Sequence, residues 1–140
     1  MKIMCDTNVI LDVLLDRQPF ADDSSRVFEL CERGVVKGFI TASTATDIFF
    51  LTHRHFHDTE RTYFAFGKLL EIFKIAPVTN AEILEAYLMR FPDFEDALLS
   101  VCAQKMSCDF LVTRNVKDFK GASLKCLEPK AFLQSFFGAK

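Results

Sequence analysis

The sequence contains no tryptophan and only 2 tyrosines beside 16 phenylalanines. Any core built from this chain, and any contact between two copies of it, must therefore depend on phenylalanine packing. The sequence also lacks an apolar run of the roughly 20 residues that would cross a bilayer, and its opening residues MKIMCDTNV carry no signal-peptide pattern. We therefore expect a cytoplasmic protein.

An excess of positive charge is also missing, since the formal net charge is −2 and the isoelectric point is near 5.9. Proteins that bind nucleic acids commonly present a strongly basic face, so a contact of that kind would need a local group of basic residues. The 5 cysteines include no C-x-x-C pair. This argues against a thiolate zinc site and favours buried, reduced thiols.

Short apolar segments alternate with helical patterns along the 140 residues, which we expect to form one domain over residues 1–140. Strands are predicted at residues 2–5, 37–41, 74–78 and 108–113. Helices are predicted at residues 9–14, 21–33, 59–73 and 129–137, with three more starting at Ser43 or Thr44, at the capping box of Thr79 and Glu82, and at Asp93. The helix that contains Phe49 and Phe50 is apolar nearly all round, so we expect it to be well buried.

This alternation predicts an α/β fold in which helices cover both faces of a central, mainly parallel sheet, because parallel crossovers need an intervening element. Ligands of such sheets bind beyond the carboxyl ends of the strands. Asp6 follows the first predicted strand, and Asn115 and Asp118 follow the strand at 108–113. The first turn of the helix that carries Asp96 is expected to face the same crevice, whereas Asp47 lies within an apolar helix.

Each of these acids has a structural explanation when taken singly, as a helix cap, a first-turn acid or a turn residue. Together they are harder to explain in that way, because carboxylates gathered in one crevice repel one another unless cations neutralise them. Mg²⁺ or Mn²⁺ is the expected neutraliser, since these ions prefer hard oxygen ligands.

Three segments resemble the PIN-domain family. MKIMCDTNVILDVLL resembles the opening of PIN-domain proteins, ITASTATDIFFL the helix that carries their second acid, and FEDALLSVCAQKMSCDFLVTRNVKDF their closing acidic region. The resemblance covers nearly the whole chain in order. It implies a PIN-like three-layer α/β/α domain, with Asp6, Asp47, Asp96 and Asn115 at the four acidic positions of the family.

Two of these positions depart from the family pattern. Asp47 stands where the family usually has Glu, and Asn115 stands where it often has Asp. Asp118 can restore a carboxylate near Asn115, and Asp93 is a further acid close to the site. The departures keep open a second interpretation, a catalytically weak PIN-fold module that binds RNA or another protein.

The resemblance implies a VapC-like nuclease that cleaves RNA with Mg²⁺ or Mn²⁺, commonly the toxin of a toxin-antitoxin pair. Asp6, Asp47 and Asp96 would hold the metal, with Asn115 or Asp118 completing its shell. Arg114, Lys117 and Lys120 are candidates for contacts with phosphates, and each alone also fits a solvated loop charge. Thr113 is a candidate for orienting the phosphate, although a threonine at a strand end is more often structural.

Other features of the sequence favour different interpretations. His53 and His57 have a spacing compatible with zinc, but two ligands do not make a site, and an exposed helix end is favoured. A phosphoacceptor receiver domain would need a lysine at a late strand end, where this chain has Arg114. A homodimer is expected, because the Phe-rich C-terminal helix and the Phe49–Phe50 region offer more apolar surface than one small core absorbs.

Overall fold

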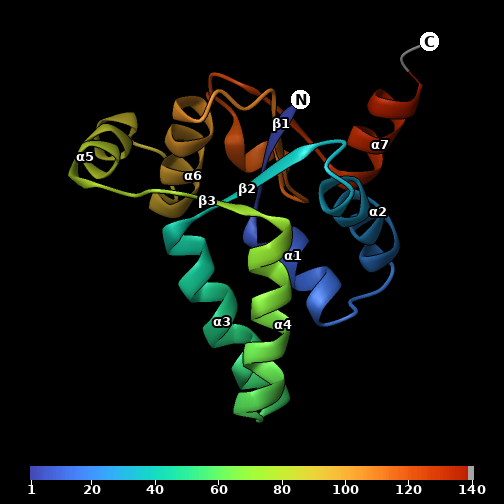
Figure 1. Cartoon of the computed structure of the whole chain (residues 1–140). Coiled ribbons are helices and arrows are strands. Elements are labelled where there is room, and N and C mark those ends of the chain that lie inside the picture. Colours follow the sequence, from blue (N-terminus) through green and yellow to red (C-terminus); the bar gives the residue numbers. More distant parts are fainter. Residues whose placement is uncertain (139–140) are drawn as a thin grey trace.

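The computed structural model describes residues 1–138, and Figure 1 shows them as a central sheet with helices on both of its faces. All strand pairs are parallel, in the order β3-β2-β1-β4-β5. The strands are β1 (Lys2–Cys5), β2 (Lys37–Thr41), β3 (Lys74–Ala76), β4 (Phe110–Val112) and β5 (Lys125–Leu127). The predicted three-layer α/β/α fold is confirmed.

The helices agree in number and order with the prediction, apart from one extra 3₁₀ turn. They are α1 (Thr7–Leu14), α2 (Phe20–Glu32), α3 (Ala42–Phe56), α4 (Thr59–Ile72), α5 (Asn80–Met89), α6 (Phe94–Lys105), the 3₁₀ helix η1 (Val116–Phe119) and α7 (Pro129–Phe137). Across residues 1–138, no helix combines the length and the apolar character that a bilayer crossing demands.

Side chains that alternate along each strand divide the core into two halves. Ile3 and Cys5 of β1 pack on the side covered by α1, α2, α3, α4 and α7. Met4 lies between them in sequence and packs on the opposite side, which α5 and α6 cover. Because successive residues of a strand point to opposite faces, the part of a strand that is buried on both sides must be apolar, as Ile3, Met4 and Cys5 of β1 are.

Helices α1 and α3 begin directly at the carboxyl ends of strands of the sheet. Asp6, the residue after β1, caps α1 by accepting a hydrogen bond from the backbone N–H of Thr7. The cap of α3 is Thr41 rather than the predicted Ser43 or Thr44, because the helix begins directly after the last residue of β2. The Thr41 hydroxyl accepts a hydrogen bond from the N–H of Thr44 at 3.0 Å. Asp93 caps α6, as predicted.

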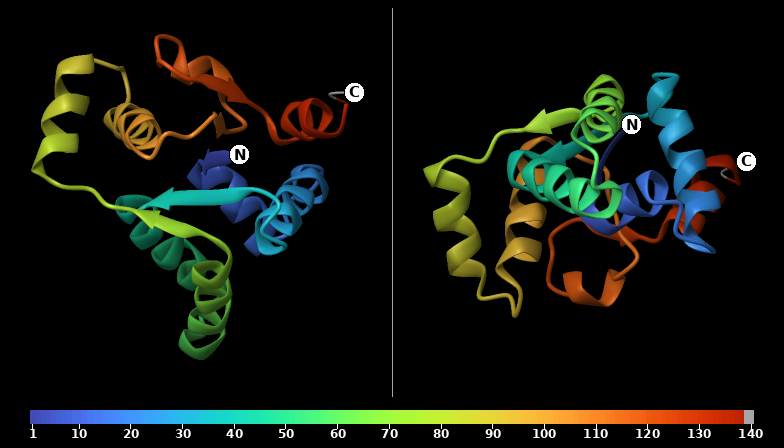
Figure 2. Two further views of the ribbon diagram at one scale, coloured as in Figure 1. Left: turned by 45° about the horizontal axis from the view of Figure 1, so that its top comes forward. Right: turned by 90° about the horizontal axis from the view of Figure 1, so that it is seen from below.

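The prediction that the whole of α3 is well buried is wrong. Helices α3 and α4 pack on each other and together project beyond the sheet (Figures 1 and 2), so only one side of α3 can be covered. Phe49 lies on the covered side, with its ring centroid 4.8 Å from that of Tyr63 and 5.3 Å from that of Phe66. The next residue, Phe50, is 61% exposed.

The edge strand β5 was not predicted. It pairs with β4 through Phe110 and Lys125, Leu111 and Cys126, and Val112 and Leu127. A strand of three residues is too short to show an alternating pattern, and its position depends on pairing with a strand already in place. The strands predicted at 74–78 and 108–113 are also shorter than expected, at three residues each.

We predict that Glu82 stabilises the fold more strongly at neutral pH than in acid. Its Oε1 accepts hydrogen bonds from the N–H and hydroxyl of Thr79, both at 2.6 Å, and its Oε2 lies 2.7 Å from Lys105 Nζ. The hydrogen bond from Lys105, followed by those from Thr79, lowers the pKa of Glu82 from 4.5 to about 2. The ionised form therefore stabilises the folded state above pH 4.5, and this stabilisation is lost as the pH falls toward 2.

Glu82→Gln should accordingly lower the melting temperature by a few degrees at pH 7, and the difference should shrink steadily as the pH is lowered through 4. Circular dichroism melts across this range measure the effect. The control is Glu71→Gln, a change in a surface pair whose two side chains are at least 60% exposed. A difference between Glu82→Gln and the unchanged chain that stays constant with pH would contradict the assignment.

Candidate active site

Asp6 is held at the carboxyl edge of the sheet by groups from two segments, the start of α1 and the end of β4. Strands β1 and β4 are neighbours, and the N–H of Asp6 donates to the carbonyl of Val112 at 2.9 Å. Its carboxylate accepts hydrogen bonds from the N–H of Thr7 at 2.7 Å and from the Thr113 hydroxyl at 2.8 Å. The side-chain amide of Asn8 lies 3.4 Å away. The orientation of this carboxylate is therefore fixed.

Thr113 connects Asp6 with the segment that follows β4. Its side chain is fully buried, and its oxygen also accepts a hydrogen bond from the N–H of Asn115 at 3.0 Å. Asn115 stands immediately before η1. In this arrangement Thr113 positions Asp6 and Asn115, and its hydroxyl is already engaged with both.

The acids predicted to meet at this edge lie close enough to perturb one another. The pKa of Asp96 is raised from 3.8 to about 7, first by burial and then by the negative charges of Asp93, Asp6, Asp118 and Glu95. Burial also raises the pKa of Asp6, against the hydrogen bonds from Thr113 and Thr7, and Asp93 and Asp118 raise it further. Asp6 and Asp96, which are far apart in the sequence, therefore share one electrostatic site.

Asp47 lies at the margin of this site. Its side chain is exposed, and its negative charge acts on Glu95, whose pKa is raised mainly by burial. The Glu95 carboxylate accepts a hydrogen bond from the Ser43 hydroxyl at 3.1 Å and so connects the first turns of α3 and α6. Sequence reasoning missed Glu95, although the adjacent acids Glu95 and Asp96 in the first turn of a helix were a visible signal.

A hollow of about 570 Å³ opens beside these acids. It is lined by Pro92, Asp93, Asp96, Lys117, Asp118 and Lys120. Carboxylates from the start of α6 and from η1 thus face the same space as two lysines. Such a hollow can hold a cation against its acidic wall and a phosphate against its lysines.

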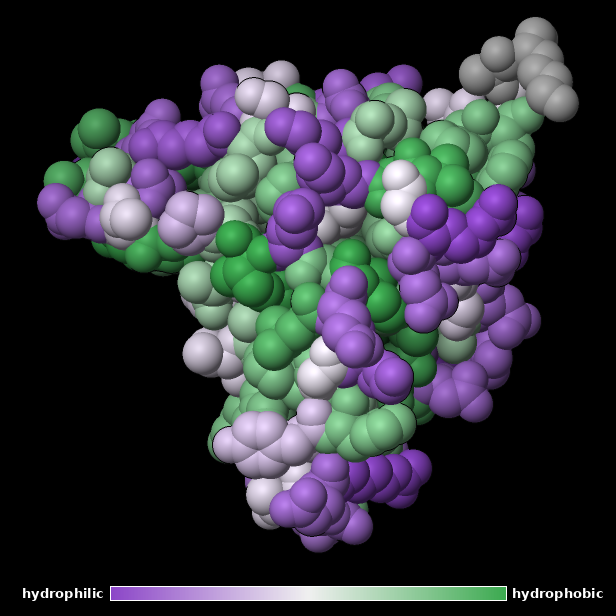
Figure 3. Space-filling model, viewed as in Figure 1, coloured by the Kyte–Doolittle hydropathy of each residue, from purple (hydrophilic) through white to green (hydrophobic). Residues whose placement is uncertain are grey.

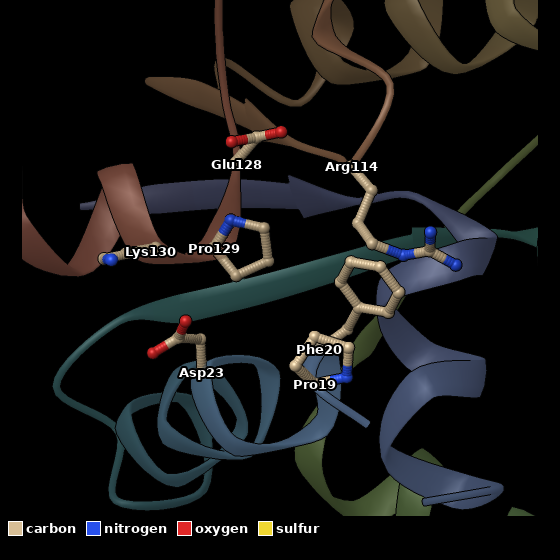
Figure 4. Close-up of a pocket in the computed structure, with 7 residues that line it drawn as sticks. All are labelled: Pro19, Phe20, Asp23, Arg114, Glu128, Pro129 and Lys130. Carbon is tan, nitrogen blue, oxygen red and sulfur yellow. The ribbon is translucent and has the colours of Figure 1, made fainter. Parts of the chain in front are cut away.

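Arg114 lies on the other side of the end of β4, and Figure 4 shows its guanidinium reaching over the ring of Phe20. Its Nε lies 2.6 Å and its Nη2 3.2 Å from the two carboxylate oxygens of Asp12, and the guanidinium carbon is 4.0 Å from the centre of the Phe20 ring. The side chain of Asp12 is completely buried. Because a buried carboxylate left without its partner costs about 3–5 kcal/mol, Arg114 has a structural role apart from the acidic hollow.

Sequence reasoning did not identify Asp12 as the partner of Arg114. The signal was a single acid within the apolar run VILDVL. An acid surrounded by apolar residues on a buried helix needs a cation, but the sequence gives no direct indication of which one. Arg17 is a second cation near this carboxylate, 3.9 Å away.

The oxygen ligands at the acidic edge suit a hard divalent cation. Several carboxylates crowd together there, and the raised pKa values of Asp6 and Asp96 reflect both burial and mutual repulsion. Within residues 1–138, no three His, Cys, Asp or Glu side chains are arranged so that they could hold a metal ion together. The oxygen donors alone fit Mg²⁺ or Mn²⁺, whereas coordination by three carboxylates would require their side chains to move closer together.

These features define an α/β domain with a parallel sheet and a group of acids at its carboxyl edge. The chain belongs to the PIN domain family, because the model of that family matches residues 2–117. The resemblance seen in the sequence is thereby confirmed. No curated protein has a sequence that matches this chain.

Several solved structures share the fold. VapBC2 from Rickettsia felis bound to a promoter DNA fragment is 17% identical, covers 91% of this chain and 98% of its own, and has a TM-score of 0.71. FitAcB from Neisseria gonorrhoeae is 18% identical, with the same coverage and a TM-score of 0.69. VapC20 from Mycobacterium tuberculosis, a toxin that cleaves the sarcin-ricin loop, is 14% identical, covers 78% and 86%, and has a TM-score of 0.62.

We predict that ionised Asp96 destabilises the metal-free protein. Its pKa is about 7 in the folded chain and 3.8 as an ordinary side chain, so the folded state holds this proton more tightly and loses stability as the pH rises from about 4 to 7. Asp96→Asn should therefore raise the melting temperature in EDTA at pH 8 and leave it almost unchanged at pH 4.

Thermal melts by differential scanning fluorimetry measure this difference, with the surface change Glu32→Gln as control. Mn²⁺ at pH 8 should raise the melting temperature of the unchanged chain more than that of Asp96→Asn, because the cation relieves a repulsion that the variant lacks. Equal melting temperatures for the two proteins at pH 8 in EDTA would show that the charge of Asp96 does not destabilise the folded protein.

Proposed function

We propose that this protein is a metal-dependent ribonuclease that hydrolyses RNA phosphodiester bonds at the acidic edge of its sheet. The observation that carries the proposal is that the negative charge of Asp6, with that of Asp93, raises the pKa of Asp96 in addition to the effect of burial. Groups with perturbed pKa values in a hollow are typical of functional sites. Membership of the PIN domain family supports the same conclusion.

Asp6, Asp47 and Asp96 would hold Mg²⁺ or Mn²⁺, with Asn115 or Asp118 completing the shell. A bound divalent ion supplies a hydroxide at neutral pH and stabilises negative charge on phosphate oxygens. Thr113 and the N–H of Thr7 keep the Asp6 carboxylate oriented toward the site. Lys117 and Lys120 line the same hollow and would hold the phosphates of the substrate strand.

The biological setting that we propose is a toxin-antitoxin pair. Similar structures include VapBC-1 from nontypeable Haemophilus influenzae and a toxin-antitoxin complex from Klebsiella pneumoniae. An antitoxin protein would then be the partner of this chain, and RNA would be its substrate. The cytoplasmic location expected from the sequence stays a prediction.

A second candidate function is a PIN-fold module that binds RNA or protein and cleaves weakly. Two observations favour it. Asp47 is exposed at the margin of the acidic site, and Asn115 supplies an amide where the family often has a carboxylate. The first feature places one carboxylate away from the centre of the site and the second removes a negative charge, so both weaken the hold on a metal ion. A cleavage assay distinguishes the two candidates.

The purified protein should cleave single-stranded RNA in the presence of Mn²⁺ or Mg²⁺ and should stop when EDTA is added. Asp6→Asn and Asp96→Asn should each lower the rate on the order of 100-fold or more, since changes even to groups that only orient metal ligands cost about 10–100-fold. Gel separation of end-labelled RNA under denaturing conditions measures the rate. Glu32→Gln is the control, because it removes a surface carboxylate away from the site and should leave the rate unchanged.

Folding of each variant is checked by circular dichroism, so that loss of activity cannot be attributed to unfolding. If the unchanged chain binds RNA but does not cut it with either metal, the second candidate function replaces the first. Cleavage that persists at full rate in both folded variants would remove the acidic edge from the mechanism.

We also predict that the protein forms a homodimer through apolar surface. Phe137 is 51% and Phe50 is 61% exposed, and Figure 3 shows apolar areas over α7 and along α4. Multi-angle light scattering should give a mass near twice 16.0 kDa. If the two copies meet through α7, Phe137→Ser should shift this mass toward that of the monomer. If they meet through α3, Phe50→Ser should do so. A monomer at every concentration would reject the dimer.

A further inference from the structure

A second hollow of about 520 Å³ lies on the side of β4 away from the acidic edge. Figure 4 shows that its walls come from the start of α2, the start of α7 and the residue that follows Thr113. The side chains that matter here are Phe20, Asp23, Arg114, Glu128 and Pro129, all of which line it. Nothing in the proposed cleavage mechanism uses this space.

Flat, rigid groups form the apolar part of the hollow. Phe20 is 42% exposed, and the rings of Pro19 and Pro129 lie beside it in the same wall. Phe20 and Pro19 stand at the first turn of α2, and Pro129 is the first residue of α7. Because these positions belong to helix ends that the core holds in place, the surface is preformed. A planar ring is the ligand shape that such a surface fits.

Arg114 extends this flat surface without offering its charge to an anion. Its guanidinium carbon lies 4.0 Å from the centre of the Phe20 ring, while Nε and Nη2 are bound to the buried carboxylate of Asp12. Its positive charge is thus neutralised inside the protein. What it presents to the hollow is a fixed planar group, which stacks on aromatic rings.

The charges that remain in the wall favour a ligand that donates hydrogen bonds. Asp23 and Glu128 carry two negative charges against the single positive charge of Lys130. In the described part of the chain, neither carboxylate takes part in a hydrogen bond or an ion pair, and they lie on either side of Pro129 (Figure 4). A phosphate would be repelled by this pair of acids, whereas an amino group would be accepted.

We propose that this hollow binds the unpaired base of a nucleotide next to the cleaved phosphate, and that it prefers bases with an exocyclic amino group. The inference rests on the proposed ribonuclease function and adds a specificity subsite to it. Arg114 directly follows Thr113, which is bonded to Asp6, so the hollow and the acidic edge lie on two sides of one strand end. An RNA strand that crosses this end would place a phosphate at the acids and a neighbouring base against Phe20.

The chemistry of single-stranded RNA recognition matches these groups. Unpaired bases stack on aromatic side chains and on arginine planes, and carboxylates accept hydrogen bonds from base amino groups such as N4 of cytosine. Uracil carries no amino group. Cytosine should therefore bind more tightly than uracil, which distinguishes this hollow from a surface that only attracts the RNA backbone.

The test uses the full chain and two fluorescein-labelled single-stranded probes, oligocytidylate and oligouridylate, with Ca²⁺ as the divalent ion. Fluorescence anisotropy should show that oligocytidylate binds at least about 10-fold more tightly, the effect of one accepted hydrogen bond to a charged group. Phe20→Ala should weaken binding of both probes about 5-fold or more, because the stacking surface is lost. Glu128→Gln should reduce the preference for cytosine and leave oligouridylate binding nearly unchanged.

The matched control is Tyr87→Ala, which removes an exposed aromatic ring that also lies under an arginine, on α5 and outside the hollow. It should leave both the affinity and the preference as they are. The surface position of Glu128 on the loop before α7 makes Glu128→Gln a variant that keeps the fold. The preference for cytosine thus stays testable even if Phe20→Ala proves unstable.

The outcomes separate this inference from the proposed function. Metal-dependent cleavage that continues while Phe20→Ala and Glu128→Gln change neither affinity nor preference would overturn the subsite and leave the nuclease in place. An affinity that depends on Phe20 and a preference for cytosine that depends on Glu128, in a protein that cuts no RNA, would support the subsite and overturn the nuclease. If the unchanged chain binds neither probe, the subsite is rejected whatever the cleavage assay shows.

Discussion

The pairing of β1 with β4 is the constraint on which the site depends. It places Asp6 beside Thr113 through the hydrogen bond from the Asp6 N–H to the carbonyl of Val112, and it brings the start of α1 next to the segment that contains Asn115 and Asp118. These residues come from opposite ends of the chain. Without that parallel pairing Asp6 would not lie near Asp96, Asp93 and Asp118, and the mutual effects of these acids on the pKa values of Asp6 and Asp96 would be lost.

The parts of the fold that the sequence predicted are those with local signals. The capping box of Thr79 and Glu82 marks the start of α5, and Asp93 followed by apolar residues marks the start of the buried helix α6. The parts that it did not predict depend on contacts between distant segments. Strand β5 exists because β4 offers it an edge, and the exposure of Phe50 follows from the projection of the α3–α4 pair beyond the sheet. Neither cause is visible in a short window of sequence.

The candidate site, like the fold, was predictable only where the signals are local. Asp6 and Asp96 could be proposed from strand ends, helix starts and family resemblance, and they do share one electrostatic site. The surroundings of Arg114 could not be predicted, because its side chain is held by the buried carboxylate of Asp12 on α1. The sequence placed this residue among the phosphate contacts, whereas its guanidinium is bound to Asp12 and stacked on Phe20. The acidic hollow and the hollow beside Phe20 are therefore distinct chemical environments separated by one strand end.

Asp6 is both the cap of α1 and a member of the acidic group. Asparagine caps helices about as well as aspartate, whereas alanine costs about 1 kcal/mol. A single-nucleotide change from an aspartate to an asparagine codon at this position would therefore leave the helix start intact while removing a charge from the site. The charge at the site can therefore be removed at this position at little cost in stability, so the acidic group and the stability of α1 can change independently of each other.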